Sequence, residues 1–119
     1  MTEEQVHLGV LTFLRTCLPS AAAATINHSP NESPSGYGWR TKMQRLGNMP
    51  GWPDLEFFYN GGAYFVEVKA PKGRVSQIQL ACHRHLATAG AHVGVARSIA
   101  DMEAILETWG IPLRARVAA

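Results

Sequence analysis

Three charged side chains, Asp54, Glu67 and Lys69, have the types and the spacing to carry out chemistry together. Side chains alternate between the two faces of a β-strand, so Glu67 and Lys69 share one face. Val66 and Val68 take the other face. Asp54 stands where the preceding strand begins, and in a short hairpin the start of one strand lies beside the end of the next. The spacing therefore predicts that two carboxylates and one amine converge.

Two carboxylates beside an amine suit a hard divalent cation bound next to a phosphate. Mg²⁺ and Mn²⁺ prefer oxygen ligands and keep water in their remaining positions. Such a cation acidifies a bound water and polarises the phosphate. Lys69 would orient or deprotonate that water, or stabilise charge in the transition state. The backbone carbonyl of Val68, between the two functional side chains, is a further expected ligand. The pattern predicts metal-dependent hydrolysis of a phosphodiester bond.

The elements that must hold these residues are also visible in the sequence. Residues 55–59 and 63–69 are predicted strands, and an Asn-Gly-Gly run between them favours a hairpin turn. A helix is predicted over 76–89, because Ser76 and Gln79 form a capping box and a glycine follows the last turn. This helix comes directly after the strand that carries two of the three charged residues.

The remaining chain adds helices and one more strand around this hairpin. Apolar residues at steps of three and four predict an amphipathic helix over 3–18, and a short apolar run predicts a buried strand over 93–96. Residues 21–26 are expected to run into a short strand. Residues 27–38 are rich in Ser, Pro, Asn and Gly, so we predict a loop there. The order predicts an α/β fold with a small mixed sheet flanked by helices, in one domain over 1–119. The other expected elements are a short helix over 39–46, a last helix over 100–109 and an edge strand over 113–117.

The composition and the charge distribution indicate which class of binding partner to expect. Hydrophobic residues make up 46% and charged residues 17%, which excludes the apolar-poor signature of disorder. A net charge of +2 is too small to establish a nucleic-acid partner, so the placement of the charges matters more. A basic cluster without acids occupies 40–45, near the aromatic residues Tyr37, Trp39 and Trp52, and further cations follow the second strand. Such clusters suit phosphate contacts. The expected DNA-binding residues are Arg40, Lys42, Arg45, Lys72 and Arg74.

Cysteine usage and the lack of a targeting signal favour the cytoplasm. Cys17 and Cys82 fall in predicted helices and form no CxxC pair, so free thiols in a reducing compartment are expected. The first residues lack the basic region of a signal peptide, and no apolar run approaches the ~20 residues that span a bilayer. His83 and His85 are two apart on a helix, which predicts different faces, and no zinc-ligand spacing is present. We expect a soluble cytoplasmic protein without a His/Cys zinc site.

The run from Gly51 to Gln79 resembles the PD-(D/E)XK nuclease signature, and more closely the VRR-NUC (virus-type replication-repair nuclease) family. The shared features are a Gly-x-Pro-Asp-Leu turn, Glu-Val-Lys-Ala-Pro-x-Gly-Arg at the second strand, and a following Ser-x-x-Gln helix. Residues 90–98 resemble the family's Gly-x-x-Val-x-Val-x-Arg-Ser pattern with a one-residue offset. The resemblance covers nearly the whole chain and implies a restriction-endonuclease-like core.

The resemblance also implies roles for individual residues. Asp54 and Glu67 would bind the metal and Lys69 would be the catalytic lysine. Gln79 would be the polar residue that the family places on the next helix, although its capping-box position gives a structural explanation as well.

A glutamate of the first helix also lies near the metal in this family. Glu3 fits that position best and Glu4 stays open, and a carboxylate in a first helical turn also favours the helix dipole. For a standalone chain of this size, the resemblance implies a phage or bacterial homodimer that cuts Holliday junctions or other branched DNA. The alternatives are a non-catalytic nucleic-acid binding module, or a nuclease acting on flaps, linear DNA or RNA.

Overall fold

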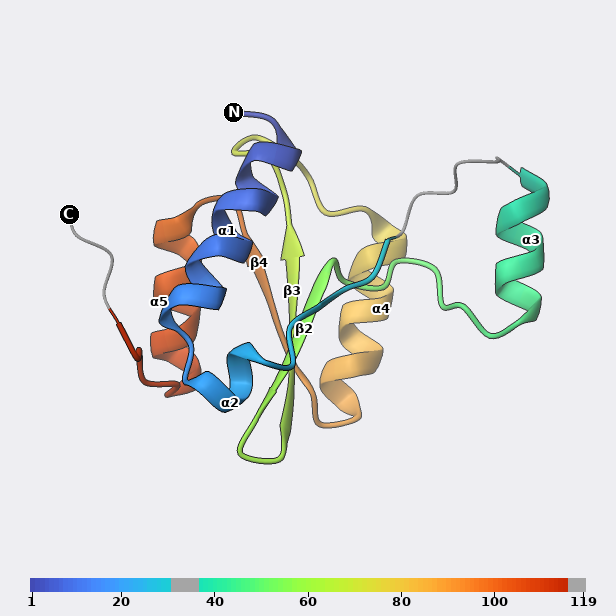
Figure 1. The fold of residues 1–119 in the computed structure, drawn as a ribbon. Coiled ribbons are helices and arrows are strands. Elements are labelled where there is room, and N and C mark those ends of the chain that lie inside the picture. Colours follow the sequence, from blue (N-terminus) through green and yellow to red (C-terminus); the bar gives the residue numbers. More distant parts are fainter. Residues whose placement is uncertain (31–36, 116–119) are drawn as a thin grey trace.

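A mixed β-sheet lies between two layers of helices in the computed structural model, which describes residues 1–30 and 37–115 (Figure 1). Helices α1 (Glu3–Cys17), α2 (Ser20–Ala23) and α5 (Ile99–Trp109) lie on one side of the sheet. Helix α4 (Gln77–Thr88) covers the other side. The arrangement confirms the predicted α/β class with a small mixed sheet flanked by helices.

The order of the strands places the end of β3 at the centre of the sheet. The order is β1 (Asn27–His28), β2 (Leu55–Tyr59), β3 (Gly62–Val68) and β4 (His92–Ala96). The first two pairs are antiparallel and β3 pairs with β4 in parallel, with α4 as the crossover between them. Asn60 and Gly61 have φ angles of 46° and 79°, the left-handed conformation of a tight hairpin turn. The hairpin is thus confirmed, with boundaries within one residue of those predicted.

The two faces of β3 bury different kinds of side chain. Val66 and Val68 are fully buried in the apolar core, which α1 and α5 complete with Val10, Leu14 and Leu106. Glu67 is only 1% exposed and lies on the opposite face, beneath α4. The predicted alternation is confirmed, and the strand is buried on both sides.

Local signals placed the main helices correctly. Thr2 and Gln5 form a capping box at α1, and Ser76 and Gln79 form the predicted one at α4. Gly110 ends α5 in the left-handed conformation. The short helix expected over 39–46 is present as α3 (Tyr37–Arg45), which stands apart from both layers (Figure 1). No helix within the described residues is both long and apolar enough to cross a membrane.

The expected strand run over 21–26 is wrong. An alanine-rich segment follows Pro19 and forms α2 instead, as alanine propensity and a proline at a helix start favour. Strand pairing begins only at Asn27, inside the segment predicted as loop, where Asn27 Nδ2 donates to Glu56 Oε1 at 3.0 Å. Residues 31–36 of that predicted loop lie outside the described residues.

The expected edge strand over 113–117 is also wrong for its described part, because residues 113–115 form no strand and 116–117 lie outside the described residues. Arg114 explains the difference. Its N–H donates to the Cys17 carbonyl at 2.6 Å, and its Nη2 donates to the carbonyls of Arg15 and Thr16 at 2.6 and 3.1 Å. These bonds hold the segment against the carboxyl end of α1, away from any sheet edge.

Candidate active site

Asp54 stands one residue before β2 and is fixed through both its backbone and its side chain. Its carbonyl accepts the Ser29 N–H at 2.9 Å and lies 2.8 Å from His28 Nδ1, which donates to it. Its Oδ2 accepts the Val68 N–H at 2.7 Å. Leu55, which pairs with Val66, is the first residue of β2. Beyond this pair, the Asp54 carboxylate and not a backbone carbonyl of β2 accepts the hydrogen bond from β3. Asp54 therefore lies beside the end of β3, where hairpin geometry predicts it.

Gly51 holds the turn before Asp54 against α4. Its φ is 79°, and a Cβ atom there would lie 2.7 Å from the Ile78 carbonyl oxygen and 3.0 Å from Gln79 Cα. Only glycine tolerates both the left-handed conformation and this close approach of two backbones. The turn that carries Asp54 is thereby packed directly on the first turn of α4.

Both carboxylate oxygens of Glu67 accept hydrogen bonds from α4. Gln79 Nε2 donates to Oε2 at 3.3 Å, and His83 Nε2 lies 3.1 Å from Oε1. Burial lowers the pKa of His83, and the nearby Lys69 ammonium lowers it further. The imidazole is therefore neutral at pH 7, and its contact with Glu67 is a hydrogen bond and not an ion pair.

Gln79 serves the helix and the site with the two ends of one amide. Its Oε1 accepts the backbone N–H of Ser76 at 2.9 Å, which completes the capping box. Its Nε2 is left to donate to Glu67. The capping role of Gln79 therefore does not exclude a part in the site, because the cap fixes the amide that reaches the carboxylate.

The half-buried Asp54 and the fully buried Glu67 form a carboxyl pair. Burial raises the pKa of Asp54 to about 7, and a hydrogen bond with Glu67 adds to this, against the opposing effect of the Val68 N–H. Burial also raises the pKa of Glu67, while its hydrogen bond with Asp54 and the Lys69 ammonium oppose that rise. Two buried carboxyl groups in contact hold a proton more readily than either would alone. A divalent cation would relieve the same repulsion, so the donor set fits one.

Lys69 directly follows β3 and is the third charged residue of the site. Its side chain is 13% exposed, and its N–H donates to the Ala96 carbonyl of β4 at 3.0 Å. Its Nζ lies 3.9 Å from Glu3 Oε1 at the start of α1. The structure therefore places Glu3 beside Lys69, but Glu3, Asp54 and Glu67 do not gather as a set of three that could hold a metal ion.

Few side chains of the described residues are placed to bind a metal ion. Nowhere in residues 1–30 and 37–115 do three or more His, Cys, Asp or Glu side chains gather as a set that could hold a metal ion. Asp54 and Glu67 would be the two carboxylate ligands. The N–H and C=O of one strand residue point to the same side, so the Val68 carbonyl faces the Asp54 side. Water would fill the other positions, as Mg²⁺ prefers.

The basic cluster over 40–45 is exposed but does not adjoin the carboxyl pair. Arg40, Lys42 and Arg45 are exposed on α3, and Trp39 is 41% exposed there. Figure 1 shows α3 beyond α4, separated from the sheet by the chain that leads to β2. The cluster is exposed and available for a partner, but it stands on a helix away from the sheet that carries the carboxyl pair.

Two other cations lie closer, on the turn between β3 and α4. Lys72 and Arg74 are both exposed on this turn. Arg97, after β4, donates from Nε and Nη2 to the Gly73 carbonyl at 3.2 and 3.1 Å, and its own N–H donates to Asp101. Arg97 therefore fixes the turn that carries these two cations.

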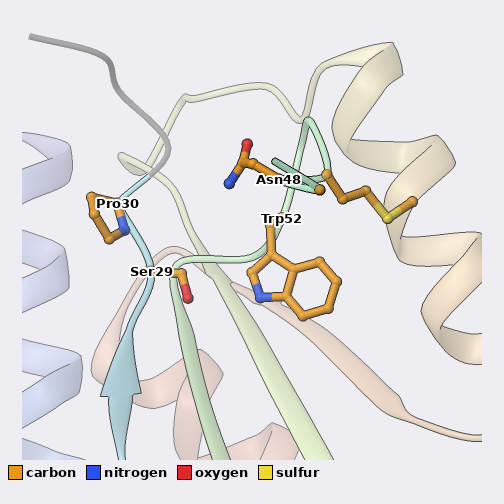
Figure 2. A pocket seen from close by; sticks show the side chains of 6 residues that line it. Ser29, Pro30, Asn48 and Trp52 are labelled. Carbon is orange, nitrogen blue, oxygen red and sulfur yellow. The ribbon is translucent and has the colours of Figure 1, made fainter. Parts of the chain in front are cut away.

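A pocket of about 250 Å³ opens next to the turn that carries Asp54, lined by Ser29, Pro30, Gly47, Asn48, Met49 and Trp52. Figure 2 shows the Trp52 indole below Asn48 and beside Ser29. Trp52 packs edge-on against Phe65, with ring centroids 5.3 Å apart. The pocket adjoins the carboxyl pair without containing it, and Trp52 links it to the face of β3 that carries Glu67.

Sequence reasoning missed His28 and His83. His28 supports the backbone of Asp54, and its ring packs edge-on against that of His7 at 4.7 Å. His83 lies four residues after Gln79 on α4, so both share one helical face. That spacing was a usable signal, because a residue four positions from a predicted site residue points the same way.

Known proteins share both sequence features and fold with this chain. The family model for the VRR-NUC domain matches residues 15–100, which include Asp54, Glu67, Lys69 and Gln79 but begin after Glu3. A solved structure described as a VRR_NUC domain protein has a TM-score of 0.71 at 22% identity, covering 90% of this chain and 86% of the other. No curated protein matches the sequence. The family match spans most of the chain, so the protein belongs to the VRR-NUC family and has a function of the nuclease type.

Proposed function

We propose that the protein is a Mg²⁺- or Mn²⁺-dependent endonuclease that hydrolyses phosphodiester bonds in DNA. The observation that carries the proposal is the convergence of Asp54, Glu67 and Lys69 at the end of β3. Two carboxyl groups with raised pKa values, buried against each other, destabilise the folded chain unless a cation or a proton neutralises them. Such an arrangement is typical of a site kept for function.

Each residue has a distinct part in the proposed reaction. A cation bound by Asp54, Glu67 and the Val68 carbonyl would supply charge neutralisation at the scissile phosphate and a more acidic water. Lys69, whose ammonium charge acts on the Glu67 carboxyl group, would orient or deprotonate the attacking water, or stabilise the phosphate oxygens. Glu3 pairs with Lys69 and would set the position of its ammonium group.

The proposed substrate is branched DNA, such as a Holliday junction. Lys72 and Arg74 on the turn beside Lys69 would contact phosphates near the cut, and Arg40, Lys42 and Arg45 on α3 would contact a more distant part of the duplex. Paired cuts in a four-way junction require two active sites, so we propose a two-fold homodimer as the working form.

Cleavage of a labelled four-way junction tests the proposal. Wild type would be assayed with Mg²⁺ and with Mn²⁺, beside Lys69→Ala, Asp54→Asn and the exposed control His85→Ala on α4. We expect paired cuts with wild type and the control, and none with the other two variants. Cleavage that survives both variants would refute the assigned site. Junction binding without cleavage would favour a non-catalytic binding module instead.

Substrate class and assembly need separate measurements. Cutting rates on flaps, single strands, linear duplex and RNA, measured beside the junction, would show whether branching matters. Light scattering at the assay concentration should give the mass of two chains, and the mass of one chain would contradict paired cutting by a dimer.

The role of α3 has its own test in the salt dependence of DNA binding. The slope of log K against log salt is negative, and each lost phosphate contact reduces its magnitude by about 0.9 for duplex DNA. Replacing Arg40, Lys42 and Arg45 with alanine should therefore make the slope less steep by about 2 to 3. An Arg84→Ala variant, exposed on α4, serves as the control. An unchanged slope in the triple variant would remove α3 from the DNA interface.

A further inference from the structure

His83, on helix α4, contacts the buried carboxylate of Glu67 in the proposed site. Its Nε2 lies 3.1 Å from Glu67 Oε1, while Gln79 Nε2 lies 3.3 Å from Glu67 Oε2. His83 is 9% exposed and Glu67 is 1% exposed. Each oxygen of this carboxylate therefore has one donor from α4, and solvent has almost no access to replace either of them.

The acceptor fixes the form of the imidazole. A carboxylate oxygen only accepts, so Nε2 must carry the hydrogen, as a neutral imidazole with Nε2–H can provide. An ionised carboxylate has about four lone-pair directions. Two donors from α4 occupy two of them and prevent the carboxylate from rotating, while the others stay open for a cation. A buried carboxylate that lost one donor would be free to turn and would be poorly solvated.

We propose that His83 is a positioning residue, which holds Oε1 of Glu67 so that the carboxylate presents its free lone pairs toward Asp54 and a bound cation. The assignment rests on the proposed function, because it gives Glu67 the part of a metal ligand. His83 does not touch substrate or water in this scheme. It acts only through Glu67, in the way that partners behind metal ligands commonly set ligand orientation.

Two amide variants separate the donor from the rest of the ring. In His83→Gln the amide nitrogen falls near the position of Nε2 and can still donate to Glu67. In His83→Asn the side chain is shorter, and its amide nitrogen falls near Nδ1, out of reach of Oε1. Both variants carry the same amide group and differ by one methylene, which decides whether the amide nitrogen reaches Oε1. His85→Asn, exposed on the same helix, is the control.

The first measurement is binding of Mn²⁺ alone, without DNA, by calorimetry, with urea unfolding in EDTA to verify that each variant folds. We expect His83→Asn to weaken Mn²⁺ binding about 10- to 100-fold. His83→Gln and His85→Asn should stay close to wild type. In junction cleavage, His83→Asn should need correspondingly more metal for half-maximal rate and recover most of the wild-type rate at saturating metal.

Several outcomes would overturn the assignment of His83. Wild-type Mn²⁺ affinity in His83→Asn would show that the hydrogen bond does not position the ligand. A loss in His83→Gln equal to that in His83→Asn would show that the donor is not what matters. Nitrogen-15 NMR of metal-free wild type should show the Nε2–H tautomer, and the Nδ1–H tautomer would overturn the assignment without reference to metal. If wild type bound no Mn²⁺, the proposed function itself would fail, together with the purpose given to His83.

Discussion

Replacing Asp54 with asparagine should abolish cleavage and, in the absence of metal, stabilise the fold at neutral pH. The Asp54 pKa rises from 3.8 to about 7 in the folded protein, mainly because the carboxyl group is buried and then because it meets Glu67. Asparagine keeps an oxygen to accept the Val68 N–H and has an amide that can donate to Glu67. It therefore mimics the protonated form of Asp54 at every pH.

The sign of the pH effect follows from the direction of the shift. Between pH 4 and pH 7 the folded chain holds a proton at Asp54 that the unfolded chain has released. Stability of the wild type should therefore fall as the pH rises through this range and level off above pH 7. A tenfold change in an acidity constant corresponds to about 1.4 kcal/mol, which gives about 4 kcal/mol for a fully shielded group. Asp54 is only half-buried, and solvent screening lowers the expected effect to about 1–2 kcal/mol.

The assay is urea unfolding in EDTA, followed by tryptophan fluorescence, at several pH values from 4 to 8. At pH 8, Asp54→Asn should be more stable than wild type by about 1–2 kcal/mol, and near pH 4 the two should converge. At 10 mM Mg²⁺, a site with a dissociation constant near 1 mM would add about 1.4 kcal/mol to wild type and little to the variant. A variant that is less stable than wild type across the whole pH range would refute the carboxyl-pair reasoning.

Three further substitutions test the frame around the carboxyl pair. Gly51→Ala forces alanine into the left-handed conformation, with its Cβ 2.7 Å from a backbone oxygen of α4. We therefore expect the free energy of unfolding in urea to fall by about 2–4 kcal/mol. A loss under about 1 kcal/mol would contradict the close packing. Arg97→Ala removes both hydrogen bonds to the Gly73 carbonyl. We expect weaker junction binding in a gel-shift assay, with a loss of less than about 2 kcal/mol in the free energy of unfolding. Unchanged binding would show that the turn needs no such support. Lys69→Arg keeps the positive charge but cannot give up its proton, so single-turnover cleavage should fall to near the level of Lys69→Ala if the lysine deprotonates water; substantial activity would favour a purely electrostatic part.

Asp54, Glu67 and Lys69 could be brought together from the sequence because every step between them is local. The strand period of two fixes the face shared by Glu67 and Lys69, and a tight hairpin fixes which residue of β2 lies beside the end of β3. The helices were equally readable. Periodicity and capping boxes are short-range signals, and the structure confirms the predicted ends of α1 and α4 within one residue.

The segments whose structure was predicted wrongly depend on contacts between distant parts of the chain. Arg114 is held by carbonyls at the end of α1, almost the length of the chain away, so residues 113–115 form no strand. Strand β1 likewise takes its partners from residues 54–56, which are distant in the sequence. The separation of α3 from the body could not be read from its own residues, which specify a helix but not where it packs.

The sequence by itself determined the fold class, the hairpin, and the convergence of two carboxylates with a lysine, because hydrogen bonds and side-chain periods act over a few residues. Tertiary structure alone decided how that constellation is supported. His83 meets Glu67 only when α4 folds back over β3, and Gly51 meets Ile78 only when the turn before β2 packs against the backbone of the first turn of α4. The burial that raises the pKa of Asp54 likewise belongs to the packed molecule, since desolvation depends on everything that surrounds a charge and not on its neighbours in sequence.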